Sequence, residues 1–211
     1  MKYPDDFINK IICGDCIEIM KYIPDKSIDL ILTDPPYNAG IEYDNYKDNL
    51  TDEEYKFFIY KFMKEFLRIS KRTIIFVGIG NLFKYPEPEM VLIWLKRNGY
   101  SRSGYVIHNC YEPIVCYGKL KSIFTDVYDY PIVFQKDKIE HPTPKPLRLI
   151  EKLIVDFSKE GDVVLDPFVG SGTTAVAAKK LKRKYIGIDI SEKYCEVAKK
   201  RLETEVDNLL F

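Results

Sequence analysis

The sequence lacks several features that mark common classes of protein. It carries no excess charge, because 32 lysines and arginines balance 32 aspartates and glutamates in 211 residues. A basic coat over the whole molecule is therefore excluded, and any nucleic-acid-binding groove has to be a local patch. No stretch approaches the roughly 18 apolar residues that cross a membrane. The N-terminal decapeptide has two acidic residues and lacks the apolar run of a signal peptide.

Cysteine and histidine are also scarce. The five cysteines are an odd number without the density of a disulfide scaffold, which predicts a reduced, cytoplasmic protein. Cys13 and Cys16 form a single CxxC pair, and the chain has only two histidines, His108 and His141. Structural zinc needs four ligands, so we predict no metal site.

The apolar runs alternate in type along the chain. Strands are predicted at 10–15, 28–34, 72–78, 162–166 and 184–189, and an antiparallel pair at 105–109 and 113–119. Helices are predicted at 16–23, from the capping box of Thr51 and Glu54 to Ile69, at 90–98 before Gly99, at 146–158, and from Thr173 and Ser191. Residues 119–142 look irregular. This order predicts one α/β domain over 1–211, with a doubly wound, mostly parallel sheet.

A glycine-containing turn follows the strand that ends at Asp166. Gly170 and Gly172 let the backbone approach a ligand closely before a helix opens at Thr173. The next strand ends at Asp189, where a carboxylate can accept both hydrogen bonds of a ribose diol.

Two other interpretations of this turn stay open. It can be an ordinary turn between a strand and a helix. The spacing of Gly170, Gly172 and Ala175 also satisfies a loose dinucleotide fingerprint. Against a dinucleotide, the Asp166 carboxylate would oppose a pyrophosphate but suits an ammonium group. A cofactor with a cationic amino acid end and a ribose fits both Asp166 and Asp189.

A second motif, Asp34-Pro35-Pro36-Tyr37, stands where the strand 28–34 ends. The prolines fix the backbone and leave their carbonyls as acceptors beside the Asp34 carboxylate. Two such acceptors match an amino group with two N–H donors, and the Tyr37 ring offers a stacking surface for a base. A proline-stiffened turn that ends a strand is the simpler alternative.

These motifs resemble those of the amino-methylating DNA methyltransferases, which act on adenine N6 or cytosine N4. Asp34-Pro35-Pro36-Tyr37 looks like their catalytic motif, and residues 166–174 look like their cofactor loop. Residues 141–146, which include Lys145, are similar to the segment before that loop in the β-type motif order. Residues 14–16 resemble the start of the segment before the catalytic strand, and residues 111–119 the sheet hairpin.

The resemblance implies a Rossmann-like, seven-stranded sheet with an antiparallel hairpin at one edge. It implies S-adenosyl-L-methionine as cofactor and double-stranded DNA as substrate, with the target base flipped out. The implied catalytic residues are Asp34, Pro35, Pro36 and Tyr37, and the implied cofactor-binding residues are Asp15, Cys16, Lys145, Asp166, Phe168, Gly170, Gly172 and Asp189. An acid at position 34 favours adenine N6 over cytosine N4 in this family.

Some expectations are less specific. The catalytic motif lies in the N-terminal half and the cofactor loop in the C-terminal half, which leaves 79–140 as the candidate target-recognition segment. A homodimer and a cognate restriction endonuclease are candidate partners, and no membrane is expected. RNA and protein-glutamine methyltransferases share the tetrapeptide, usually after the cofactor loop. No cysteine follows a proline, so the nucleophile of the cytosine-C5 enzymes is missing. Residues 78–81 are a weak loop signal.

Overall fold

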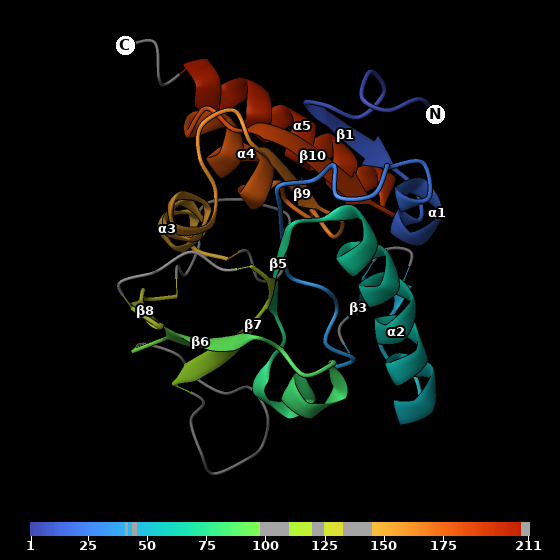
Figure 1. Ribbon diagram of the computed structural model, residues 1–211, viewed down its shortest axis with the longest axis vertical. Coiled ribbons are helices and arrows are strands. Elements are labelled where there is room, and N and C mark those ends of the chain that lie inside the picture. Colours follow the sequence, from blue (N-terminus) through green and yellow to red (C-terminus); the bar gives the residue numbers. More distant parts are fainter. Residues whose placement is uncertain (41, 44–45, 98–109, 120–124, 133–144, 208–211) are drawn as a thin grey trace.

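The computed structural model describes residues 1–40, 42–43, 46–97, 110–119, 125–132 and 145–207 (Figure 1). In this part of the chain, one sheet has eight strands in the order β1-β10-β9-β2-β5-β7-β6-β8. The strands are β1 Lys10–Cys13, β2 Leu30–Thr33, β5 Arg72–Phe76, β6 Met90–Leu95, β7 Tyr111–Gly118, β8 Val127–Asp129, β9 Val163–Asp166 and β10 Lys184–Asp189. Two further strands, β3 Glu42–Tyr43 and β4 Tyr46–Lys47, pair only with each other.

Most neighbouring strands of the large sheet are parallel. The exception is β7, which runs antiparallel to both β5 and β6. The predicted α/β class and the mostly parallel sheet are therefore confirmed. The sheet has eight strands instead of seven, because β8 adds a short parallel strand outside β6.

Helices cover both faces of the sheet (Figure 1). They are α1 Cys16–Met20, α2 Asp52–Ile69, α3 Leu147–Phe157, α4 Thr173–Lys180 and α5 Glu192–Asp207, with a 3₁₀ helix η1 at Ile79–Lys84. One apolar cluster joins α1 and α2 to one face, and a second joins α3 and α4 to the other. Within β2, Ile31 faces the first cluster whereas Leu30 and Leu32 face the second. Burial on both faces explains why such strands are near-continuous apolar runs.

The predicted helix at 90–98 is wrong. Residues Met90–Leu95 form the strand β6, paired antiparallel with β7 over its whole length. Burial alternates along it, with Leu92 and Trp94 buried and Val91 exposed, which is the period of a strand. Val91 and Ile93 are β-branched and Trp94 is aromatic, and these types favour a pleated surface. The apolar run was too short for its periodicity to distinguish a strand from a helix.

The predicted antiparallel pair is only partly described. Residues 105–109 lie outside the described residues, whereas 113–118 belong to β7, whose antiparallel partners are β5 and β6. The region 119–142 was expected to be irregular, but it contributes the three-residue strand β8. Across the described residues, no helix has the length and apolar character needed to span a membrane.

Candidate active site

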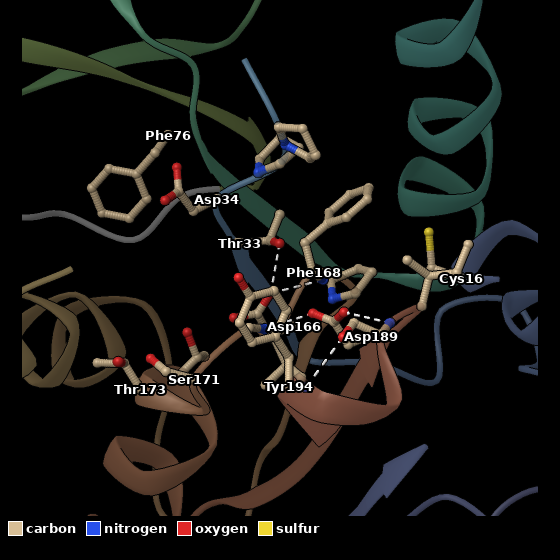
Figure 2. A pocket seen from close by; sticks show the side chains of 18 of the residues that line it. Cys16, Thr33, Asp34, Phe76, Asp166, Phe168, Ser171, Thr173, Asp189 and Tyr194 are labelled. Atoms are coloured by element: carbon tan, nitrogen blue, oxygen red, sulfur yellow. Dashed lines mark hydrogen bonds between the residues drawn. The ribbon is translucent and has the colours of Figure 1, made fainter. Parts of the chain in front are cut away.

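A pocket lies at the carboxyl ends of the central parallel strands (Figure 2). Because β2, β9 and β10 run in the same direction, the residues at or just after their ends meet at one edge of the sheet. In the view of Figure 2, Asp34 lies on one side of this pocket and Cys16 on the other, with Asp166 and Asp189 between them. The fold therefore brings both sequence motifs into one cavity.

The buried carboxylate of Asp166 connects the two motifs. The Thr33 hydroxyl, which directly precedes the tetrapeptide, donates to Asp166 Oδ1 at 2.6 Å. The Phe168 N–H donates to the same oxygen at 3.1 Å. Burial raises the pKa of Asp166 to about 6 despite these hydrogen bonds. No lysine or arginine among the described residues forms an ion pair with Asp166, so the site suits a cationic group supplied by a ligand.

Asp189 holds the turn that follows β9. Its carboxylate accepts the Gly170 N–H at 2.8 Å and the Ser191 N–H at 2.9 Å. Burial raises the pKa of Asp189 as well, above that of an ordinary aspartate. The Ile190 N–H also hydrogen-bonds this carboxylate, and because two carboxylate oxygens offer about four acceptor positions, Asp189 retains acceptor capacity. Asp189 lines the pocket and can accept hydroxyl hydrogens there.

Gly172 lets the turn after β9 pack closely against α5. It adopts φ +83°, and a Cβ built on it would lie 2.9 Å from the Cβ of Ala198 on α5. Only glycine fits both the left-handed backbone and this close approach of the turn to α5. Gly172 does not line the pocket itself, so its predicted place against a cofactor is indirect.

The far end of the pocket is formed by the segment after β1 and by aromatic rings. Asp15 caps α1 by accepting the Ile17 N–H at 2.8 Å, and Cys16 follows it. Burial raises the pKa of the Cys16 thiol above its ordinary value, so the thiol stays protonated and acts as an apolar wall. Phe168 lies edge-on to Phe58, with ring centroids 6.1 Å apart.

The tetrapeptide is fixed from two sides. The Tyr55 hydroxyl on α2 donates to the Pro36 carbonyl at 2.9 Å. The Asn81 side chain on η1 donates to the Tyr37 carbonyl at 2.8 Å. Gly78 lets the Tyr37 ring approach closely, because a Cβ there would lie 3.1 Å from the ring. The segment 78–81, which was only a weak loop signal in the sequence, therefore helps to hold the tetrapeptide in place.

A charged cluster surrounds the Asp34 carboxylate. The Lys145 ammonium lies 2.5 Å from Asp34 Oδ2 and 3.2 Å from Glu112 Oε1. Lys96 lies 3.1 Å from Glu112 Oε2. Burial raises the pKa of Asp34 against the opposing effect of Lys145. Burial would also raise the pKa of Glu112, but the two ammonium groups outweigh it and lower that pKa.

The structure gathers almost all predicted site residues. Every one of them except Gly172 lines this pocket. Lys145, predicted from the resemblance to contact the cofactor, lies on the carboxylate of the tetrapeptide. Sequence reasoning assigned no role to Glu112 and Lys96, and it missed a set of lining residues that carries no motif: Phe58, Phe76, Ile150, Ser191 and Tyr194.

Comparison with known proteins gives a consistent result. The sequence profile of the N6/N4 family described as DNA methylase matches residues 28–138 and 117–200. The type II methyltransferase M.HpaI of Haemophilus parainfluenzae is 34% identical over 93% of this chain and 74% of its own length. M.HinfI of Haemophilus influenzae, also a type II methyltransferase, is 35% identical over 94% of this chain and 69% of its own.

The fold of this chain also matches those of solved DNA methyltransferase structures. M1.HpyAVI in complex with SAM superposes with a TM-score of 0.68 at 26% identity, covering 92% of this chain and 98% of that one. The cytosine-N4-specific PvuII DNA methyltransferase gives a TM-score of 0.74 at 19% identity, over 90% and 85% of the two chains, which supports the fold alone. Since the family profile and the relatives cover most of the chain, the protein belongs to the N6/N4 DNA methylase family.

Proposed function

We propose that the protein transfers a methyl group from S-adenosyl-L-methionine to N6 of adenine in duplex DNA. The observation that carries this proposal is the hydrogen bond between Thr33 and Asp166, which joins the two motifs at one pocket. The Asp34 carboxylate and the Pro35 carbonyl, an acceptor pair for an amino group, then share a pocket with two more carboxylates. These belong to Asp166 and Asp189, and neither has a cationic partner among the described residues. A dinucleotide pyrophosphate would be repelled by the Asp166 carboxylate.

The cofactor side of the pocket fits the chemistry of this methyl donor. The Asp166 carboxylate would bind the ammonium group, and Asp189 would accept the ribose hydroxyl hydrogens. The turn from Phe168 to Gly170 would pack along the amino acid end, and Asp15 and Cys16 would border the adenine. Relatives support this assignment, because M1.HpyAVI binds SAM. When bound, the cofactor supplies an electrophilic methyl group on a sulfonium.

The residues of the tetrapeptide would act on the target base. A base inside a duplex cannot reach the pocket, so it has to be flipped out of the helix. Tyr37 would stack on the base while the Asp34 carboxylate and the Pro35 carbonyl accept its two amino hydrogens. This holds the nitrogen lone pair toward the cofactor side, and Asp34 stabilises the positive charge that develops on nitrogen. Without a Pro-Cys nucleophile, transfer proceeds by direct displacement.

The choice of adenine rests on Asp34. Among the amino-methylating DNA methyltransferases, an acid at this position is more often found in adenine-N6 enzymes, whereas serine is more common in cytosine-N4 enzymes. Both amino groups offer two N–H donors, so cytosine N4 is the alternative target. In this proposal a single domain that spans 1–211 binds both the cofactor and the target base.

Target recognition would fall to the segment 79–140. Its described part includes the 3₁₀ helix η1 and the strands β6, β7 and β8. A homodimer would enlarge the DNA-binding surface. With a cognate restriction endonuclease as partner, the methylation would protect the DNA from cleavage.

The test is transfer of labelled methyl groups to unmethylated duplex DNA, with RNA and a glutamine-containing peptide as competing substrates. We expect labelled DNA only. Asp34→Ala should abolish transfer, with a loss on the order of 100-fold or more, while cofactor binding stays within a few-fold. Preferential labelling of RNA or peptide would refute the DNA substrate, and near-normal turnover of the variant would refute the role of Asp34.

A further inference from the structure

Groups of the chain itself cover both carboxylate oxygens of Asp34. The Tyr37 hydroxyl donates to Oδ1, and the Lys145 ammonium donates to Oδ2 at 2.5 Å. On the proposed function, the amino group of the target base has to bind this same carboxylate. Each oxygen keeps a second acceptor position, so the base would compete with these donors for Asp34 and would need the space beside the Tyr37 ring that the Lys145 ammonium occupies.

Lys145 occupies the place that the base would need. Its ammonium lies 5.3 Å from the centroid of the Tyr37 ring, 5.0 Å from that of Phe76 and 5.8 Å from that of Trp94. It therefore contacts the ring on which the base would stack, and it donates to the acceptor that the base would use. A cation over aromatic rings is stabilised there, but a stacked base competes for the same faces.

Glu112 is the second acceptor for both of these donors. The residue is buried on β7, and its Oε1 lies 2.7 Å from the Tyr37 hydroxyl and 3.2 Å from the Lys145 ammonium. The Tyr37 hydroxyl has one hydrogen, so it can donate to only one of the two carboxylates at a time. Both donors can thus transfer from Asp34 to Glu112 with little movement.

We propose that Glu112 is a positioning residue, which takes over the Lys145 ammonium and the Tyr37 hydroxyl when the target amino group binds Asp34. In the absence of DNA, the Lys145 ammonium then occupies the place of the target amino group on Asp34. This inference rests on the proposed function, because it needs Asp34 to accept the amino hydrogens. Lys96, on the other oxygen of Glu112, keeps that carboxylate in place during the exchange.

The charge of Glu112 is what matters in this exchange. With a neutral glutamine at 112, the side chain could still accept from Tyr37. Lys145 would have lost one of its two carboxylates and would bind Asp34 more firmly. The base would then compete with a stronger ion pair, so the effect should appear in the KM for DNA.

The test compares Glu112→Gln with the double variant that also carries Lys145→Met, at about pH 8, well above the ordinary pKa of a carboxyl group. Glu112→Gln should lower kcat/KM for DNA about 10- to 100-fold, mainly through KM, with unchanged cofactor affinity. The double variant should be at least several-fold more active than Glu112→Gln alone, because the competitor is gone. A double variant no better than the single one would overturn the proposal.

Two controls separate this mechanism from a structural role. Glu112→Asp keeps the charge, so it should retain most of the activity, and equal losses in Glu112→Asp and Glu112→Gln would overturn the proposal. If Glu112→Gln is too unstable to assay, a folded Glu112→Asp that loses most of its kcat/KM for DNA would overturn the proposal. Glu196→Gln also removes one carboxylate charge, in an exposed ion pair with Lys199 on α5 outside the pocket, and should leave kcat/KM unchanged. Absence of methyl transfer to DNA by the native protein would instead refute the proposed function itself.

Discussion

Asp166 couples stability to ligand binding, and Asp166→Asn tests both. The carboxylate is 5% exposed, and burial raises its pKa from 3.8 to about 6. Because the folded pKa lies above the unfolded one, the ionised carboxylate destabilises the fold as pH rises from about 4 to 6. A difference of this size corresponds to about 3 kcal/mol above pH 6.

Asparagine removes that cost while keeping two of the local hydrogen bonds. Its side-chain oxygen can still accept from the Thr33 hydroxyl and the Phe168 N–H. Asp166→Asn without ligand should therefore be more stable than the native protein near pH 8, by up to about 3 kcal/mol. The gain should shrink toward pH 4, where the native carboxyl is already neutral. Urea unfolding at both pH values measures this difference.

The same change should weaken cofactor binding. Loss of a charge-assisted contact to the ammonium group predicts about 10- to 100-fold lower affinity for S-adenosyl-L-methionine. Affinity of the native protein should also fall as pH drops through about 6, since Asp166 becomes protonated. Calorimetric titration should show this fall in the native protein and a weaker one in Asp166→Asn. A variant that is less stable at pH 8 and binds the cofactor normally would refute the reasoning.

Further changes have separate expected outcomes. Asp189→Ala should weaken cofactor binding about 10- to 100-fold by calorimetry, and unchanged affinity would mean that the ribose is held elsewhere. DNA affinity should fall steeply from low to physiological salt despite the zero net charge, because phosphate contacts dominate affinity, and a flat response would argue against a nucleic acid. Thr51→Ala should cost about 1 kcal/mol of unfolding free energy by removing the capping box of α2, and an unchanged urea midpoint would contradict this.

The sequence was most informative where local patterns are strong. The capping box of Thr51 and Glu54 predicted the start of α2, and Asp166 and Asp189 ended their strands as expected. The segment 90–98 was misassigned because its strand character depends on pairing with β7, which a local pattern does not show. The strand β8 has only three residues, too few for any periodicity.

The contacts around Asp34 show what sequence reasoning misses at the site. Glu112 reaches Tyr37 across 75 positions of the chain, through the register of β7 in the sheet. Nothing local distinguishes that glutamate from a solvent-exposed one. The motifs predicted which side chains meet at the pocket, whereas the fold determines which groups hold Asp34.

The identity of the methylated nucleoside shows which base the protein modifies. DNA from a methylation-free host that expresses this protein should be digested to nucleosides and analysed by mass spectrometry, beside DNA from a host that expresses Asp34→Ala. We expect N6-methyldeoxyadenosine with the native protein and none with the variant. N4-methyldeoxycytidine alone would contradict the adenine assignment, and no methylated nucleoside above the Asp34→Ala background would contradict the proposed activity itself.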